Sequence, residues 1–424
     1  MLNPVGVPAD TGSDFVSAAQ AAKMLRVKPQ TLYTYVSRGL IRSIAQRDQK
    51  SRLYYREDLE KLKARSNARH GAEPAAESAI RWGQPVINTS ITEITPGGPR
   101  YRGRLALDLA REGRSFESVA ELLWTGIQHH EPLLWEHELI PRDFKAQLDR
   151  VVLQRELPPL LRILAAATAV LGVAEPSHNE IRRGTTIPAA RQLILTLTGC
   201  LGYLGANPGF RFPDPHQTVA QNAAQTLIEK PSEEMVSAIN AALVLCADHE
   251  LSSSTFAARV AASTGAELRA CVLAAIGAHS GELLGGSCDR AEDLLRRARS
   301  KEDVHRRLTE LEQAETRVPG FNLLLYPEDD PRARYLLHRA HTLSSRNARA
   351  QLIDEFIEEA ERRLHLWPSL EVGLVALAAT LELPERSASA LWAVGRTAGW
   401  IAHVMEQRLA GFVLRPRARY VSVK

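Results

Sequence analysis

The chain has 424 residues, with 53 Lys and Arg against 49 Asp and Glu, four Cys and 45% apolar residues. This length and balance predict about two or three globular domains, and they exclude global disorder and the collagen-like and coiled-coil classes. The scattered cysteines form no C-x-x-C pair, so neither a metal site nor a disulfide framework is expected. Without a signal peptide or an apolar run long enough to cross a bilayer, a cytoplasmic protein with no membrane partner is predicted.

Positive charge is concentrated at the N-terminal end. Residues 1–70 hold 13 Lys and Arg against 6 Asp and Glu, a net charge of +7, whereas residues 71–424 carry a net charge of −3. A compact basic segment on a mildly acidic body predicts a separate module with an anionic partner.

The basic segment begins with two short predicted helices. Ser17 and Gln20 form a predicted capping box at the start of the first helix. The second helix is predicted over 29–38, with Pro at its first position and Gly directly after its end. A basic loop and a short strand over 53–55 follow, and then a third helix. Two short helices joined by a tight turn predict a helix-turn-helix domain over residues 14–63.

The pattern A-x-x-L-x-V-x-P-x-T-L-Y-x-Y-x-x-x-G-L-I, followed by R-L-Y-x-x-x-D-L, lies within Ala18–Leu62. It resembles the winged helix-turn-helix of the mercury-regulator and excisionase type. The resemblance implies duplex DNA as a partner. Five residues would face the major groove and three wing residues would contact phosphates: Gln30, Thr31, Tyr33, Thr34 and Arg38, then Arg47, Lys50 and Arg52. A helical module used for packing or protein contact is the alternative, and both interpretations stay open.

Residues 64–80 are small, polar and without pattern, and they predict a linker. A hairpin is expected next, with strands over 88–94 and 100–103 joined by a Pro-Gly-Gly turn. Beyond it, apolar residues at three- and four-residue spacing predict packed helices almost throughout. The clearest are Ser115–Trp124, Phe144–Leu153, Glu233–Cys246, Thr255–Ser263, Ala266–His279 and Ser387–Gln407. The body is therefore expected to be mostly α.

Several long motifs follow one another along the body. They are Tyr101–Gly103, Ala247–Leu251 with Ser254–Arg259, Arg396–His403 with Glu406 and Gln407, and Leu414–Tyr420. Together they resemble the citrate synthase family over about residues 82–424. The resemblance implies a dimer of two-domain, mostly helical subunits. By the same resemblance the large domain covers 82–285 and 383–424, and the small domain covers 286–382.

The family implies a Claisen-type condensation of acetyl-CoA with oxaloacetate, without a bound cofactor. A carboxylate removes a methyl proton, one His stabilises the enolate oxygen, a second His polarises the ketone, and arginines hold the dianionic oxo acid. The motifs imply His249, Arg332 and Arg396 as residues that bind the oxo acid, with Arg415 contributed across the dimer interface. The pocket for oxaloacetate or a citrate-like carboxylate is therefore expected to be retained.

The positions that carry the reaction depart from the family. Where the family reads G-P-L-H-G-G-A-N, this chain reads G-E-L-L-G-G-S-C, which puts Leu284 at the enolate-stabilising His. Where the family reads P-G-F-G-H-R-V-Y, this chain reads P-G-F-N-L-L-L-Y, with Leu323 at the carbonyl-polarising His and Leu324 at an Arg associated with CoA. Glu371 aligns with the carboxylate base, one methylene longer than the usual Asp. Leucine offers no donor, acceptor or titratable proton.

Two functions stay open. The favoured one is a catalytically impaired member that binds oxaloacetate or citrate as a sensor, a DNA-linked regulator or a regulatory subunit. The alternative is a divergent citrate or methylcitrate synthase, which would use acetyl-CoA or another acyl-CoA as co-substrate. Leu284 and Leu323 favour the first. His279 is expected to point to another face than Leu284, and His403 to make a structural contact. A homodimer is the default, and a heterodimer in which Arg415 completes the pocket of an intact paralogue stays open.

Overall fold

The computed structural model describes residues 15–25, 27–28, 30–32, 36, 41, 43–45, 52–56, 59, 87–130, 133–135, 140–154, 156–174, 180–314, 318–326, 329–343, 347–416 and 420. The chain forms two compact units, Met1–Asn88 and Thr89–Lys424. Among the described residues, no helix combines the length and the apolar character that crossing a bilayer requires.

The N-terminal unit contains a short helix and an antiparallel sheet. Its described elements are β1 (Phe15–Ser17), α1 (Ala18–Leu25), β2 (Ser43–Ala45) and β3 (Arg52–Tyr55), with strand order β1-β3-β2. The Gln20 amide donates to Ser17 Oγ at 3.3 Å, and Gln20 Oε1 accepts from the Ser17 amide at 2.9 Å, which confirms the predicted capping box. The sequence predicted only the central strand, because strands of three residues are too short to show an alternating pattern.

The body begins with a second antiparallel sheet, β4 (Thr92–Thr95), β5 (Gly98–Tyr101) and β6 (Arg104–Leu105), in the order β4-β5-β6. Thr95 pairs with Gly98 across a two-residue turn, so the predicted hairpin is confirmed. Its two strands lie nearer to the turn than the predicted ranges 88–94 and 100–103. Gly98 has a φ of +112°, and a Cβ there would lie 2.7 Å from Leu107 Cδ1, so a side chain would be strained at this position.

The rest of the body is mostly helical, as the periodicity predicted. Its helices are α5 (Ala106–Arg111), α6 (Phe116–Thr125), α7 (Phe144–Val152), α8 (Leu160–Ala174), α9 (Glu180–Arg183), α10 (Thr186–Gly199), the 3-10 helix η1 (Cys200–Leu204), α11 (Val219–Leu227), α12 (Glu233–Cys246), α13 (Ser253–Ser263), α14 (Leu268–His279), α15 (Gly285–Arg297), α16 (Lys301–Ala314), α17 (Pro331–Leu343), α18 (Ala348–Leu364), α19 (Leu370–Thr380) and α20 (Ser387–Ala410).

Polar caps define where several of these helices begin. The side chains of Ser115, Thr218, Ser232 and Ser252 each accept a hydrogen bond from the backbone amide three residues later. These bonds satisfy amides that have no partner within the helix, and they set the helix start locally.

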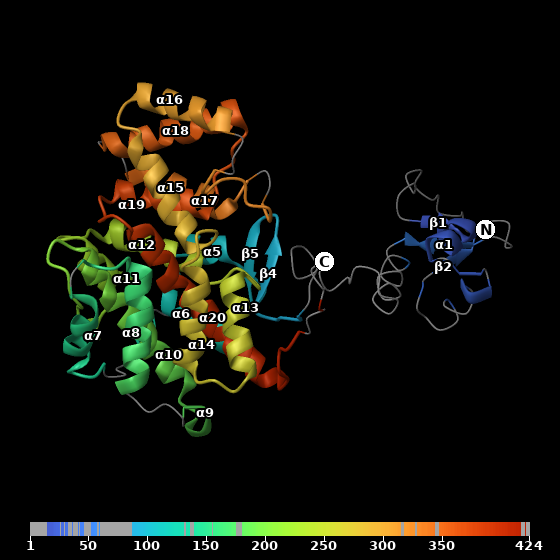
Figure 1. The fold of residues 1–424 in the computed structure, drawn as a ribbon, viewed down its shortest axis with the longest axis horizontal. Coiled ribbons are helices and arrows are strands. Elements are labelled where there is room, and N and C mark those ends of the chain that lie inside the picture. Colours follow the sequence, from blue (N-terminus) through green and yellow to red (C-terminus); the bar gives the residue numbers. More distant parts are fainter. Residues whose placement is uncertain are drawn as a thin grey trace. The chain divides into compact units, whose positions relative to one another are not determined.

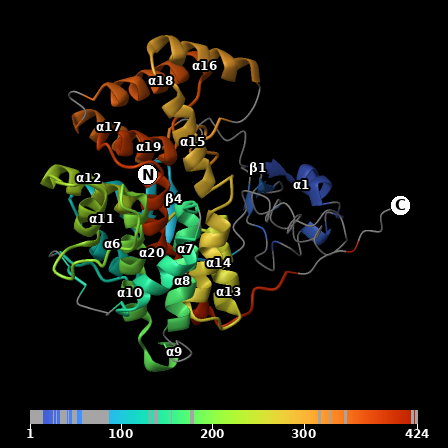
Figure 2. The ribbon, with the colours of Figure 1, turned by 60° about the vertical axis from the view of Figure 1, so that its left-hand side comes forward.

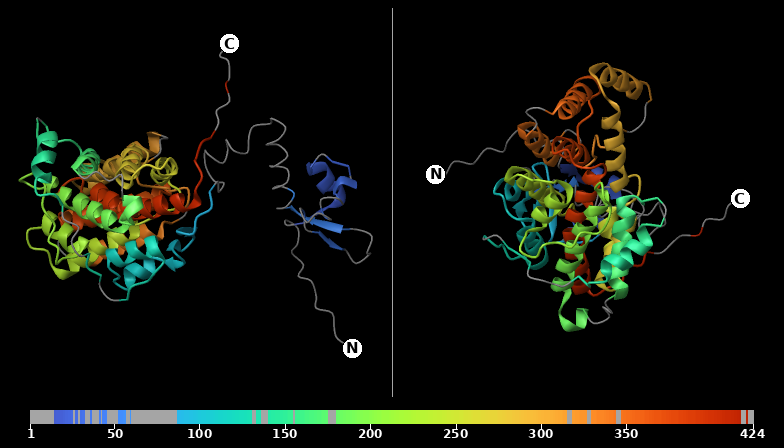
Figure 3. Two further views of the ribbon diagram at one scale, coloured as in Figure 1. Left: turned by 90° about the horizontal axis from the view of Figure 1, so that it is seen from below. Right: turned by 90° about the vertical axis from the view of Figure 1, so that its left-hand side faces the viewer.

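α20 is the central element of the body. It packs against α6, α12, α13 and α14, and its Trp400 and Ile401 are fully buried. Figure 1 shows α20 inside the body, with α16 to α19 gathered at one end and α15 leading to them, and Figure 2 shows the same arrangement from another side. In both views of Figure 3 the red α20 lies among the other helices. Residues on α20 are therefore placed close to several segments that are distant in the sequence.

Candidate ligand-binding site

His249 lies on the turn between α12 and α13, and this turn is fixed by hydrogen bonds on both sides. The buried hydroxyl of Tyr101 lies 3.2 Å from the Val244 carbonyl oxygen and 3.1 Å from the Asp248 carbonyl oxygen. Asp248 Oδ2 in turn accepts from the Glu250 amide at 3.0 Å, and Glu250 has a left-handed φ of 55°. The position of His249 is therefore set by its neighbours on the turn.

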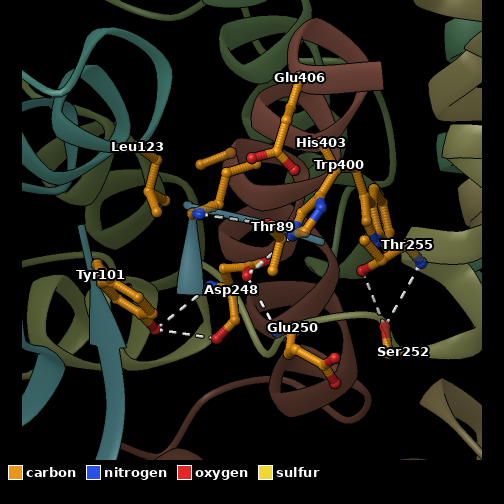
Figure 4. A network of polar contacts seen from close by, with 12 residues as sticks. Thr89, Tyr101, Leu123, Asp248, Glu250, Ser252, Thr255, Trp400, His403 and Glu406 are labelled. Carbon is orange, nitrogen blue, oxygen red and sulfur yellow. Dashed lines mark hydrogen bonds and ion pairs between the residues drawn. The ribbon is translucent and has the colours of Figure 1, made fainter. Parts of the chain in front are cut away.

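A network of buried polar groups supports the same turn (Figure 4). His403 Nε2 lies 3.3 Å from Asp248 Oδ2, and Arg259 Nη1 lies 3.1 Å from His403 Nδ1. Because a guanidinium can only donate, Nδ1 is assigned as the acceptor and Nε2–H as the donor to Asp248. Arg259 also donates to Glu406 Oε2 at 2.6 Å, and Glu406 Oε1 accepts from the Ser90 amide at 2.8 Å.

These contacts agree with the structural role expected for His403, which is fully buried. Burial alone would raise the pKa of Asp248, but the interaction with His403 and the charge of Arg396 outweigh burial and hold that pKa below its usual range. Asp248 therefore stays ionised next to His249.

Arg396 on α20 differs from Arg259, because part of its buried guanidinium finds no hydrogen-bond acceptor among the described residues. It is 3% exposed, and its Nε and Nη1 have no hydrogen-bond partner in the part of the chain that the structure describes. Burial lowers its pKa, and Arg332 lowers it further, while Asp248 and Tyr101 act against this. A buried guanidinium with unsatisfied donors is unfavourable unless a ligand supplies acceptors.

Arg332 lies in the first turn of α17 and is buried beside the same cluster. Its Nε and Nη2 donate to Asp330 Oδ1 at 3.0 Å and Oδ2 at 2.8 Å, and Asp330 Oδ2 also accepts from the Leu370 amide at 3.1 Å. Burial would lower the pKa of Arg332, but Asp330 outweighs burial and raises it. The guanidinium carbon lies 5.4 Å from the ring centre of Tyr326. Arg332 is therefore held in place at the edge of the cluster.

The rings of His249 and Tyr326 are neighbours, with a centroid distance of 5.8 Å and an angle of 50° between their planes. Among the described residues, His249 Nε2 and the Tyr326 hydroxyl have no hydrogen-bond partner although both atoms are buried. Burial, Arg332 and Arg396 together hold the pKa of His249 well below its usual range, and burial raises the pKa of Tyr326 to about 12. Both groups are therefore neutral at pH 7. The Tyr326 hydroxyl can donate a hydrogen bond, and His249 Nε2 can donate one in the tautomer that carries its proton there.

The structure thus brings together three of the four residues expected to bind the oxo acid, His249, Arg332 and Arg396. It adds Tyr326 and Asp330, to which the sequence analysis assigned no role. Tyr326 closes the motif that begins at Pro319, and Asp330 immediately precedes Pro331 at the start of α17. Their place within these motifs was the only sequence feature that could have pointed to a role for them. A side-chain contact between distant loops leaves no periodic pattern in the sequence.

Arg415 is not brought to the other three in this chain. It is exposed on the segment after α20, and within the described residues no contact joins it to His249, Arg332 or Arg396. A role across a dimer interface stays a prediction.

The positions expected to carry the reaction hold apolar groups. Leu284 precedes α15, is half-buried and packs against the main core, and Leu323 is half-buried. Leu324 is 62% exposed. Glu371 is half-buried in the first turn of α19. Burial is the main cause that raises the pKa of the Cys288 thiol, and the charge of Glu371 raises it further.

His279 ends α14, and its buried ring packs edge-on against Trp392 and Trp400 of α20 at centroid distances of 4.8 and 5.4 Å. A Cβ built on Gly285 would lie 2.8 Å from His279 Nε2, so the ring also approaches the residue next to Leu284. The expectation that it points to another face than Leu284 stays a prediction. α14 ends at His279 and a turn precedes α15, so helical spacing does not relate these residues. Burial and then Arg396 lower the pKa of His279 to about 3, so the ring is neutral at pH 7.

Few of the residues expected to contact DNA are described. Gln30 is exposed, Thr31 is half-buried, and Arg52 is exposed on β3, where its Nη1 donates to Ser43 Oγ at 3.2 Å. The others lie outside the described residues: Tyr33, Thr34, Arg38, Arg47 and Lys50. The DNA interface stays a prediction.

Two family models match the chain. One, described as the C-terminal domain of citrate synthase, matches residues 80–417, and the other, described as a helix-turn-helix domain, matches residues 15–67. The chain belongs to the citrate synthase family. A helix-turn-helix domain precedes the citrate synthase body, as the sequence predicted.

Similar proteins carry the names of synthases. Citrate synthase 2 of Bacillus subtilis is 26% identical over 361 residues, which covers 81% of this chain and 96% of that protein. Putative citrate synthase 2 of Mycobacterium tuberculosis is 34% identical over 346 residues, covering 80% and 91%. The 2-methylcitrate synthase of Shewanella oneidensis is 26% identical over 361 residues, covering 80% and 94%.

A solved structure of citrate synthase from Thermoplasma acidophilum, a ternary complex with carboxymethyl coenzyme A and oxaloacetate, has a TM-score of 0.71 to this chain. Its sequence identity is 22%, and the match covers 82% of this chain and 96% of that chain. At this identity the likeness shows the shared fold.

Two of the buried arginines, Arg396 and Arg259, are expected to differ in how much their loss changes stability. Arg396→Met is expected to change the free energy of unfolding of the unliganded protein by no more than about 1 kcal/mol, because it removes a poorly matched buried charge. Arg259→Met is expected to cost about 3–5 kcal/mol, because it leaves Glu406 without its cation. Urea denaturation of both variants measures this difference. An equal loss in both variants would show that the charge of Arg396 is compensated without a ligand.

Proposed function

We propose that the body binds oxaloacetate or a citrate-like carboxylate and has lost most of the condensation activity. The observation that supports this most directly is the group of unsatisfied buried donors on His249, Tyr326 and Arg396. An anionic ligand with several carboxylate oxygens offers the acceptors that these donors need.

The chemistry of the cluster fits a dicarboxylate better than a neutral ligand. Arg396 supplies a charged fork, which suits a carboxylate in a bidentate arrangement. His249 and Tyr326 are neutral and add hydrogen bonds without adding positive charge. Asp330 fixes Arg332, so the second cation is held in place before the ligand arrives.

Condensation needs groups that this site lacks. Leucine at positions 284 and 323 can neither stabilise an enolate nor polarise a ketone. The loss of one oxyanion-type donor costs about 10²–10³-fold in rate, and general acid–base help is worth about 10²–10⁴-fold per group. Two such losses support a site that retains binding and has little turnover.

One observation favours the alternative, a divergent citrate or methylcitrate synthase that uses an acyl-CoA as co-substrate. His279 is neutral, has an unpartnered Nε2 among the described residues and faces Gly285, next to Leu284. Such a ring has the donor chemistry that Leu284 lacks. The leucine at position 323 has no comparable substitute among the described residues, so we retain the non-condensing proposal.

The helix-turn-helix domain supports a regulatory use of this binding. A basic N-terminal module beside a carboxylate-binding body is suited to a cytoplasmic, ligand-responsive regulator that acts on duplex DNA. A regulatory subunit within a larger assembly would need the same pocket, without a need for DNA.

Carboxylate binding and turnover are measured together on the purified full chain. Calorimetry is expected to show binding of oxaloacetate or citrate, and Arg396→Ala is expected to weaken it by about 10–100-fold because the charged fork is lost. Thiol release from acetyl-CoA with oxaloacetate is expected to stay well below about 1 s⁻¹, the low end of ordinary enzyme rates.

Arg362→Gln, an exposed arginine of α18, is the control and is expected to bind normally. Release at about 1 s⁻¹ or faster would contradict the proposal, and a further loss of that release in His279→Gln would support the divergent synthase. If neither carboxylate binds, the pocket assignment is wrong.

DNA binding is expected to be salt-sensitive, because Lys and Arg displace condensed counterions. In the full chain, Arg52→Ala is expected to weaken retention of duplex DNA and to reduce the slope of log K against log salt by about 1. Lys230→Ala, an exposed cation of the body, serves as the control. If the full chain retains no duplex at low salt, the helix-turn-helix domain serves packing or protein contact instead.

We further propose a homodimer in which Arg415 is contributed to the neighbouring pocket. Arg415→Ala is then expected to weaken carboxylate binding about as much as Arg396→Ala, although the two residues do not meet within one chain. Calorimetry checks this, with light scattering to confirm an unchanged dimer. Normal affinity in an intact Arg415→Ala dimer would contradict the donated arginine. Co-purification with an intact tagged paralogue would favour the heterodimer.

A further inference from the structure

A cavity of about 640 Å³ lies where the ends of three helices meet, and none of its lining residues belongs to the carboxylate site described above. The C-terminal end of α15, the start of α18 and the end of α19 contribute its walls. Four arginines line it: Arg296, Arg297, Arg299 and Arg349. In Figure 2 these helices lie together at the α16–α19 end of the body.

Most of the carboxylates of this cavity are already paired. Asp293 Oδ1 accepts from Arg386 Nη2 at 2.7 Å, and Glu385 pairs with Arg296. Arg296 also contacts Glu292 at 3.1 Å. These pairs neutralise one another, and they leave Glu382 as the remaining carboxylate of the lining.

Three arginines of the lining are not paired with a carboxylate in this way within the described part of the chain, and only Glu382 of the lining remains to balance their charge. Arg297 and Arg299 are exposed, and neither side chain forms an ion pair within the described residues. Arg349 is half-buried, and its Nη1 and Nη2 donate to the carbonyls of Ala298 and Leu295 at 2.6 and 2.7 Å. Its partners are therefore neutral. Burial, Arg296 and Arg299 all lower the pKa of Arg349, as expected for a partly buried cation that has other cations nearby.

Three guanidinium groups around one hollow require an anion with several groups of oxygens. A single carboxylate can engage one fork, whereas a chain of phosphates presents oxygens in several directions. The volume lies within the range of small-molecule sites and leaves room beyond the phosphates. A hollow of this size at helix ends, open on one side, also suits a small anion better than a nucleic acid, which needs an extended basic surface.

We propose that this cavity is a second, separate anion site that binds a small oligophosphate through Arg297, Arg299 and Arg349. Arg297 and Arg299 would engage the phosphates from the exposed side, and Arg349 from the inner wall. The bonds from Arg349 to the end of α15 hold its guanidinium in this position before binding.

Calorimetry of the full chain with inorganic tripolyphosphate, at constant ionic strength, tests this proposal. Saturable binding is expected, and the double variant Arg297→Gln, Arg299→Gln is expected to weaken it by about tenfold or more. Because both side chains are exposed, this variant is expected to fold normally. Arg349→Gln is expected to weaken binding as well, with circular dichroism to confirm its fold.

Arg362→Gln is the matched control, since this exposed arginine of α18 pairs with Glu359 away from the cavity. It is expected to bind tripolyphosphate normally. No binding of tripolyphosphate, equal binding in the double variant, or tighter displacement by citrate than by a nucleoside triphosphate would each overturn the assignment.

The same variants separate this site from the carboxylate pocket. Arg396→Ala is expected to retain tripolyphosphate binding, and the double variant is expected to retain oxaloacetate or citrate binding. Loss of tripolyphosphate binding in Arg396→Ala would place the phosphate in the carboxylate pocket and contradict a second site. Failure of the carboxylate proposal alone would leave the tripolyphosphate result unchanged.

Discussion

The turn that carries His249 depends on a chain of polar contacts that runs from the half-buried Glu406 through the buried Arg259 and His403 to Asp248. Burying charged groups is costly unless each finds a partner, and here each member contacts the next. Since these residues come from α13, α20 and the turn after α12, the chain of contacts fixes three segments in one arrangement. The site lies directly beside it, because His249 follows Asp248 in the sequence.

The contrast between two buried arginines, Arg259 and Arg396, supports the assignment of the site. Arg259 is surrounded by acceptors, whereas Arg396 leaves two nitrogens without a partner in the described residues. A protein tolerates such a group where binding supplies the missing acceptors. The neutral rings of His249 and Tyr326 extend the same argument, since both present unused donors to the same region.

Binding and condensation depend on different parts of this fold. The binding groups lie on the turn after α12, at the start of α17 and within α20, and those segments are held by buried contacts. The reacting groups of the family would lie at positions 284 and 323, on the segments before α15 and α17. Leu284 packs against the core there. Under the proposed function, the two leucines would remove catalysis and leave the binding groups in place.

The sequence alone determined the helical class, the two-part organisation and the family, because helical periodicity, caps and long motifs are local properties of the chain. It also identified His249, Arg332 and Arg396 through their motifs. Only the tertiary structure decided that these three meet, that Asp330 occupies two nitrogens of Arg332, and that the donors of Arg396 lack acceptors. It also showed that a turn rather than a continuous helix separates His279 from Leu284. The reason is physical: pairing and burial depend on contacts between segments far apart in the chain, and no local pattern records them.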